Sequence, residues 1–296
     1  MDRARAGGGL SDRRRVPISE HASVPVLEPS TKNETIAHLQ RWLSGIRVEV
    51  EWWREWLATG GGPWPEDYRH RTGPPPDFQL AHLIPDGAPS HLEVLDVGSG
   101  PISPLGLVCP NREIRLTGCD ALAPYYQEML RDHGVTPYAA IVFALAERLT
   151  DRFPREAFDL VNVRNALDHC VDAVLGLRQI VEVTRIGGIV HLSHFENEGE
   201  RTGYIGLHQW NLTERDGRFV IWSPEGEHDV ADMFADCLEV QVERDADTYP
   251  NLITAVLRKK KNAPPADCLG QLQSIYDSFL LCQAAGAHGA ALPSGV

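Results

Sequence analysis

The stretch EVLDVGSGP (residues 93–101) decides the fold of this chain. A short, mostly apolar run ends on a carboxylate, Asp96, and two glycines, Gly98 and Gly100, follow one residue apart. Strands of a parallel sheet are buried on both faces and appear as short apolar runs. Glycines directly after such a strand leave the backbone open to a ligand. We therefore expect a buried strand near 92–97 whose carboxyl end carries a binding loop.

The residues after this loop indicate what it binds. A helix is expected over 103–109, and its N-terminus would favour a carboxylate or a phosphate. Asp120 ends the next expected strand, in LTGCD, about twenty residues further on, where an acidic residue accepts the hydroxyls of a ribose. The pattern predicts a cradle for a nucleoside cofactor.

Composition excludes several functions. The chain has 296 residues, 43% of them hydrophobic, and a net charge of −13. A nucleic-acid partner is not expected, because phosphate binding needs a concentrated basic face. The four lysines are Lys32, Lys259, Lys260 and Lys261. None lies in the middle of the fold, which excludes Schiff-base chemistry and the lysine of a phosphate-binding loop.

The six cysteines lie at 109, 119, 170, 237, 268 and 282, without CxxC spacing. They fall mainly in apolar runs, where a free cysteine behaves as a small hydrophobic residue. We expect a cytoplasmic protein with no disulfide framework and no metal site. No apolar run is long enough to span a bilayer, so no membrane association is expected.

Strand and helix patterns alternate from residue 91 onward, which indicates an α/β fold. Strands are expected near 92–97, 113–119, 139–143, 158–163, 187–194, 237–244 and 252–258. Helices are expected near 103–109, 122–133, 171–184 and 228–235. The short loop before the last strand has no room for a crossover helix. The prediction is a doubly wound, mostly parallel seven-stranded sheet with an antiparallel last strand.

The chain divides into four expected parts. Residues 1–30 lack periodicity and are expected to be disordered. Residues 31–90 are expected to form an N-terminal helical cap that covers the cofactor cleft. The sheet domain covers 91–258 and carries an insertion at 195–227 with a hairpin turning at Asp216-Gly217. Residues 259–296 form a tail with a short helix.

The glycine loop is compatible with two classes of nucleoside cofactor. A dinucleotide fingerprint would place a third glycine at the position of Ser103, and no tyrosine is followed by a correctly spaced lysine. The segment LEVLDVGSGP instead resembles the first motif of class I S-adenosylmethionine-dependent methyltransferases. LTGCDAL, FALAERL, FDLVNVRNALDH and VTRIGGIVHLSHF resemble their later motifs, in the family's order. The resemblance covers about 91–258.

The resemblance implies S-adenosylmethionine as cofactor and a Rossmann-like fold. The cofactor-binding residues it implies are Asp96, Gly98, Ser99, Gly100, Asp120, Ala146, Glu147 and Arg164. The function expected is methyl transfer to a small-molecule acceptor, through O-methylation of a natural product, sugar or acid. An NAD(P)-binding oxidoreductase and a non-catalytic S-adenosylmethionine-binding protein are the alternatives.

Two histidines at strand ends, His169 and His194, are the candidate catalytic bases. The alternative is that each only forms hydrogen bonds within the fold. His191 and His194 resemble a metal pair, but three residues apart in a strand they face opposite sides. Asp168 and Asp172 are interpreted as caps of the following helix.

Polar and aromatic residues near the insertion are the candidate acceptor site. The set is Asn165, Tyr204, His208, Gln209 and Trp210, with Tyr68 and Arg71 contributed by the cap. These residues suit a small polar acceptor, although the tryptophans could equally belong to the core. A homodimer is also possible on this evidence.

Overall fold

The computed structural model describes residues 32–245 and 251–264. The tail expected to be disordered and the helix expected in the C-terminal tail lie outside these residues. Among the described residues, no helix is both long and apolar enough to cross a bilayer.

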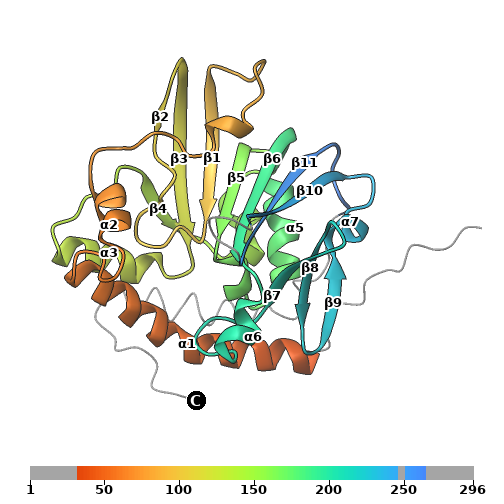
Figure 1. Ribbon diagram of the computed structural model, residues 1–296, viewed down its shortest axis with the longest axis horizontal. Coiled ribbons are helices and arrows are strands. Elements are labelled where there is room, and N and C mark those ends of the chain that lie inside the picture. Colours follow the sequence, from red (N-terminus) through yellow and green to blue (C-terminus); the bar gives the residue numbers. More distant parts are fainter. Residues whose placement is uncertain (1–31, 246–250, 265–296) are drawn as a thin grey trace, which may run out of the picture.

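The central sheet follows the predicted topology (Figure 1). Its parallel core is formed by β1 (His91–Val97), β3 (Arg112–Asp120), β5 (Phe158–Arg164) and β6 (Thr184–Phe195), with β4 (Ala140–Phe143) beside β3. β11 (Leu252–Lys259) lies between β6 and β10 (Leu238–Asp245) and is antiparallel to both. The doubly wound α/β sheet with an antiparallel last strand is confirmed. A two-residue strand, β2 (Val108–Cys109), joins β3 in addition.

Alternate side chains explain why β1 lies inside the sheet. Leu95 and Val97 pack into one hydrophobic cluster, and Leu92 and Val94 pack into another. Both faces of the strand are therefore buried, as expected of a parallel strand. This burial fixes the position at which the glycine loop leaves the sheet.

The prediction of a helix over 103–109 is wrong. Pro104 disfavours helical backbone at the residue before it, and Gly106 has a φ of +76°. The segment pairs instead with the proline-rich connection before β1, where Gln79 N donates to Leu105 O and Phe78 N to Val108 O, each at 2.8 Å. No helix N-terminus therefore follows the glycine loop.

The other predicted helices are present. They are α3 (Ala123–Asp132), α5 (Ala173–Val183) and the short α7 (Val230–Met233). Short helical turns are η1 (Ala81–Leu83), η2 (Ala146–Arg148), α4 (Leu149–Arg152) and η3 (Leu167–His169). Asp172 caps α5, as predicted, by accepting a hydrogen bond from Leu175 N at 2.9 Å.

The predicted cap consists of α1 (Lys32–Ala58) and α2 (Pro65–Thr72). Along α1 a buried stripe recurs at helical spacing, formed by Trp42, Ile46, Val50, Trp53, Trp56 and Leu57. The stripe packs against Tyr126, Met129 and Leu130 of α3. Figure 1 shows α1 crossing below the end of the sheet to which the arrow of β1 points. This is the end at which parallel sheets of this kind bind ligands.

The insertion contains α6 (Glu198–Thr202) and a separate three-stranded sheet of β7 (Asn211–Arg215), β8 (Arg218–Ser223) and β9 (Gly226–Asp229). The predicted turn at Asp216-Gly217 is confirmed, with both residues at positive φ. The third strand was not predicted. Leu212, Phe219 and Ile221 of this sheet belong to the main hydrophobic cluster, so the insertion shares the core of the domain.

Candidate active site

A cavity of about 1010 Å³ opens at the carboxyl ends of β1, β3 and β5. The glycine loop and the residues that follow β3 and β5 form one side. The α1 helix and residues 195–208 form the other. Binding pockets for single small ligands usually have volumes of about 300–1,000 Å³. The cavity is therefore large enough for a cofactor and a second molecule together.

The glycine loop takes its shape from contacts within the protein. Gly98 N and Ser99 N both donate to Cys119 O, at 2.8 and 3.2 Å. A Cβ at Gly98 would lie 2.2 Å from Ala166 Cβ, and one at Gly100 would lie 2.6 Å from the Trp53 ring. Both glycines also have positive φ. The protein itself therefore requires glycine at both positions, because a side chain at either one would collide with the wall of the cavity.

Asp96 lies at the base of the loop and is held by a buried polar chain. Asn162 Nδ2 donates to Asp96 Oδ1 at 2.6 Å, and His191 Nδ1 lies 2.7 Å from Asn162 Oδ1. Burial raises the pKa of Asp96 above its ordinary value. Within the described residues, Asp96 Oδ2 is buried without a hydrogen-bond partner, and Asp96 lines the cavity. A buried acceptor of this kind calls for a donor from a ligand.

Asp120 joins the end of β3 to the glycine loop. Its Oδ2 accepts from Gly100 N at 3.1 Å, and its Oδ1 accepts from Leu122 N at 2.8 Å. Burial raises the pKa of Asp120 to about 6. Each carboxylate oxygen can accept a second hydrogen bond, so the residue remains able to bind a ribose.

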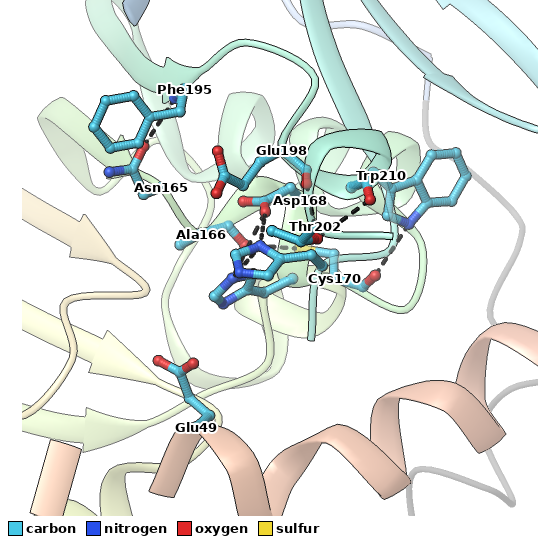
Figure 2. Close-up of polar contacts among 12 residues, drawn as sticks. Glu49, Asn165, Ala166, Asp168, Cys170, Phe195, Glu198, Thr202 and Trp210 are labelled. Carbon is cyan, nitrogen blue, oxygen red and sulfur yellow. Dashed lines mark hydrogen bonds and ion pairs between the residues drawn. The ribbon is translucent and has the colours of Figure 1, made fainter. Parts of the chain in front are cut away.

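The remaining predicted cofactor residues also line the cavity: Ala146, Glu147 and Arg164. Glu147 accepts a hydrogen bond from Asp172 N at 3.1 Å, and burial raises its pKa to about 7. Its carboxyl group is therefore partly engaged with the start of α5. Asn165, predicted to contact the acceptor, accepts from Phe195 N at 3.1 Å and connects the ends of β5 and β6 (Figure 2).

Asp168, His169 and His208 converge on the cavity. His208 Nδ1 lies 2.7 Å from Asp168 Oδ2 and 3.1 Å from His169 Nε2, while His169 Nε2 lies 3.6 Å from Asp168 Oδ2. Figure 2 shows Asp168 near Glu198 and Thr202, with Glu49 of α1 farther away, and all four residues line the cavity. We refer to Asp168, His169 and His208 as the Asp-His-His cluster.

Electrostatic interactions within the cluster are strong. Burial alone would raise the pKa of Asp168, but interactions with His169 and His208 outweigh it and lower the pKa to about 2. For His208, burial would lower the pKa, but the hydrogen bond and charge of Asp168 outweigh it and the pKa rises. Asp168 is therefore a carboxylate throughout the physiological range.

Other predicted residues lie elsewhere. His194 is buried outside the cavity lining, and burial lowers its pKa to about 4, so its ring is neutral. Trp210 is buried and donates from Nε1 to Cys170 O, and Gln209 is also buried. Tyr204 contacts Asn211. The cavity lining includes none of these residues, nor Tyr68, which packs on Trp56.

Arg71 lines the cavity, as predicted, but its guanidinium group is largely committed to the protein. Nε donates to Asp67, and one terminal nitrogen donates to Ile102 O at 2.7 Å. The guanidinium carbon lies 5.6 Å from the centre of the Trp53 ring. Arg71 therefore connects α2 of the cap to the segment that follows the glycine loop.

Sequence reasoning missed Asp168 as a site residue, because an aspartate before a helix has the pattern of a cap. Glu49 and Glu198 also line the cavity and were not predicted to do so. The signal for Glu49 was available: it is an acidic residue within the tryptophan-rich stretch VEVEWWREW. No comparable signal exists for Glu198, which lies in an insertion without periodicity.

Comparisons with known proteins agree with this geometry. Residues 95–192 match the model of a family described as "Methyltransferase domain". No curated protein matches the chain.

Solved structures with similar folds include three methyltransferases. The CurJ carbon methyltransferase is 15% identical, with a TM-score of 0.42, and the match covers 60% of this chain and 50% of that one. The trans-methyltransferase CalH, in complex with S-adenosylhomocysteine, is 14% identical (TM-score 0.40; 57% and 52% covered). An S-adenosylmethionine-dependent methyltransferase from Mesorhizobium loti is 14% identical (TM-score 0.39; 61% and 95% covered).

Residues 95–192 of the chain thus match a methyltransferase domain, and the strand order of the sheet is the one predicted for a Rossmann-like methyltransferase fold. The match to a methyltransferase domain supports S-adenosylmethionine as the cofactor rather than a dinucleotide. The site fits this molecule: Asp96 offers an unpaired buried acceptor, and Asp120 lies at the ribose position.

Proposed function

We propose that this protein transfers a methyl group to a hydroxyl oxygen of a small molecule bound in the outer half of the cavity. One observation carries the proposal: a single cavity contains both the glycine loop and the Asp-His-His cluster. When bound, S-adenosylmethionine supplies a methyl group on a sulfonium, whose transfer is an in-line displacement. The protein's task is then to align the acceptor, and alignment can contribute roughly 7–11 kcal/mol.

His169 is the residue that we propose as the base. Its ring lines the cavity and is 19% exposed, whereas His194 is fully buried. A base that removes the proton of the hydroxyl group contributes about 10²–10⁴-fold to the rate. His208 lies within hydrogen-bond distance of both Asp168 and His169. The buried carboxylate of Asp168 therefore positions His169 through His208.

The rim of the cavity supports an acceptor with an apolar body. Seven large hydrophobic side chains are exposed in the described part of the chain, and five of them line the cavity. The five are Val48, Trp52, Trp64, Phe195 and Ile205. A cluster of exposed apolar side chains at a cavity mouth indicates a ligand or partner that covers it.

This rim changes the class of acceptor that we propose. A small polar acceptor would leave it exposed to water, whereas an apolar natural product bearing a hydroxyl group would cover it. Trp52 and Trp64 pack on each other, with ring centroids 6.1 Å apart and the rings tilted by 46°, so they form one continuous aromatic surface at the rim. We therefore favour natural-product modification over modification of sugars.

The test is an acceptor screen. Purified protein, S-adenosylmethionine and a library of hydroxylated compounds graded by apolar area are incubated, and mass spectrometry detects the gain of one methyl group. We expect products among compounds with a large apolar area, and His169→Ala should reduce turnover while the affinity for S-adenosylhomocysteine changes little. Methylation confined to small polar compounds would contradict the acceptor class.

Calorimetry distinguishes catalysis from binding alone. A protein that binds S-adenosylhomocysteine but methylates no compound in the library would support the non-catalytic alternative. A protein that binds neither form of the cofactor would contradict the proposed function altogether.

A further inference from the structure

The Asp-His-His cluster has the composition of a metal site. Two imidazole nitrogens and one carboxylate oxygen, His169 Nε2, His208 Nδ1 and Asp168 Oδ2, lie within 4.8 Å of one another. This ligand set is used for divalent first-row transition metals, whereas magnesium and calcium prefer oxygen ligands throughout. Asp168 and His169 are adjacent in sequence, but His208 lies 39 residues beyond His169, so spacing alone gives no metal motif.

The separations between the three atoms suit a single ion. Ligand atoms about 2.1 Å from a metal, at octahedral or tetrahedral angles, lie roughly 3.0–3.4 Å from each other. The observed separations are 2.7, 3.1 and 3.6 Å. The three atoms therefore occupy one face of a coordination sphere with only small adjustments.

Counting protons leads to the same conclusion. His208 Nδ1 lies within hydrogen-bond distance of both Asp168 Oδ2 and His169 Nε2. His208 Nδ1 can donate only one proton. Asp168 Oδ2 and His169 Nε2 must therefore share that proton, or one of the two contacts is not a hydrogen bond. A cation at the centre would accept a lone pair from all three atoms at once.

The loops that carry these residues are fixed to each other. Gln209 N and Trp210 N donate to Asp168 O at 2.9 and 3.2 Å, and Trp210 Nε1 donates to Cys170 O at 3.0 Å. The ligand atoms are thus held before any ion arrives, which is the requirement for a precise metal site. Because His169 and His208 are 19% and 29% exposed, an ion can enter from the cavity.

We propose that the Asp-His-His cluster binds one divalent transition-metal ion, with its open coordination positions facing the cavity. An ion there would lower the pKa of a hydroxyl group that it binds, and would replace His169 in the role of base. The binding itself does not depend on the proposed methyl transfer. A protein that binds the metal and methylates nothing would contradict only the proposed function.

The experiment is a cobalt titration of the full chain. After treatment with a chelator, the protein is titrated with Co²⁺, and the d–d absorption of the bound ion is recorded. We expect one Co²⁺ per chain, displacement by Zn²⁺, and no displacement by Mg²⁺ at comparable concentration. Elemental analysis of protein purified without chelator provides a second reading.

Variants assign the site. His169→Gln should weaken Co²⁺ binding by about tenfold or more, and His208→Gln should have a similar effect. The control is His133→Gln, since the His133 ring lies 2.8 Å from Met129 O at the end of α3, outside the cavity lining. Thermal denaturation of each variant identifies any that fail to fold, and the wild-type titration does not depend on them.

Two results would overturn the proposal. One is the absence of stoichiometric Co²⁺ or Zn²⁺ binding by the wild-type protein. The other is a Co²⁺ affinity that is the same in His169→Gln and His208→Gln as in the wild type and the His133→Gln control. Either result would leave the cluster as a hydrogen-bonded set around a single proton, with His169 as the base.

Discussion

The backbone N–H of Gly100 donates to Asp120 Oδ2 at 3.1 Å and so connects the loop after β1 to the end of β3. The glycine loop and Asp120, the two parts of the predicted cofactor cradle, are therefore linked directly by a hydrogen bond. A change at Asp120 removes an acceptor from the ribose position and also releases the glycine loop.

Asp120→Asn should weaken binding of S-adenosylhomocysteine. The amide keeps the shape of the side chain but loses the charge, and one of its two ends can no longer accept a hydrogen bond. Hydrogen bonds to charged groups contribute about 1.5–3 kcal/mol, so we expect a loss of roughly 10- to 100-fold in affinity by calorimetry. Asp132→Asn, at the exposed end of α3, is the control. An unchanged affinity in Asp120→Asn would remove this residue from the site.

Glu147→Gln should change how stability depends on pH. Burial raises the pKa of Glu147 to about 7, whereas the unfolded chain has the ordinary value of 4.5. Between these values the folded protein keeps a proton that the unfolded chain has lost, so the wild type becomes less stable as the pH rises through this window. Glutamine does not ionise and avoids this loss.

We therefore expect the free energies of unfolding of wild type and Glu147→Gln to diverge with pH. The free energy of unfolding of the variant minus that of the wild type should be up to about 3 kcal/mol larger at about pH 8 than at about pH 5. Denaturant unfolding at both pH values measures this. Glu128→Gln, on the exposed face of α3, should show no such divergence. A constant difference between variant and wild type would mean that the carboxyl group of Glu147 titrates normally.

The sheet could be predicted from sequence because its signals are local. The apolar run before Asp96 and the later apolar runs each mark a buried strand, and short loops fix their direction. The helix over 103–109 was predicted from the alternation of strand and helix patterns, although Pro104 and Gly106 oppose it. Its place is taken by pairing with residues 76–79, a contact that no local pattern reveals.

The candidate site could be predicted only where it lies on strand ends. Asp96 and Asp120 lie at the carboxyl ends of β1 and β3, so the sheet fixed the direction of their side chains. Residues 204–210 have no periodicity, and nothing in the sequence indicates that His208 faces the cavity while Gln209 and Trp210 turn into the core. Asp168 resembled a helix cap because its partner lies 40 residues further along the chain.

Trp52→Ser and Trp64→Ser should raise KM for acceptors with an apolar body. Each ring is about half exposed at the rim, so covering it by a ligand would contribute about 1–2 kcal/mol, or roughly 5- to 30-fold in KM. The affinity for S-adenosylhomocysteine should be unchanged, because neither side chain contributes to the glycine loop. Val108→Ser, also exposed but outside the cavity lining, is the control. Equal KM values for all three variants would show that the acceptor does not contact the tryptophans.

Gly45→Ala should destabilise the protein, against the usual preference of helices. Alanine is favoured over glycine within a helix by up to about 1 kcal/mol. At this position of α1, however, a Cβ would lie 2.2 Å from Gly206 O and 2.9 Å from Leu207 Cδ2. The helix or the segment before His208 must then move, and such overpacking costs about 1–3 kcal/mol.

Ser44→Ala, at the neighbouring exposed position of the same helix, provides the matched control and should be nearly neutral. Denaturant unfolding measures both variants. The cap and the insertion meet at Gly45 and Gly206, so the substitution should also displace His208 from Asp168 and weaken Co²⁺ binding by the cluster. If Gly45→Ala is instead as stable as Ser44→Ala or more so, α1 does not pack against residues 206–207, and the enclosed cavity on which the proposed function rests would be absent in solution.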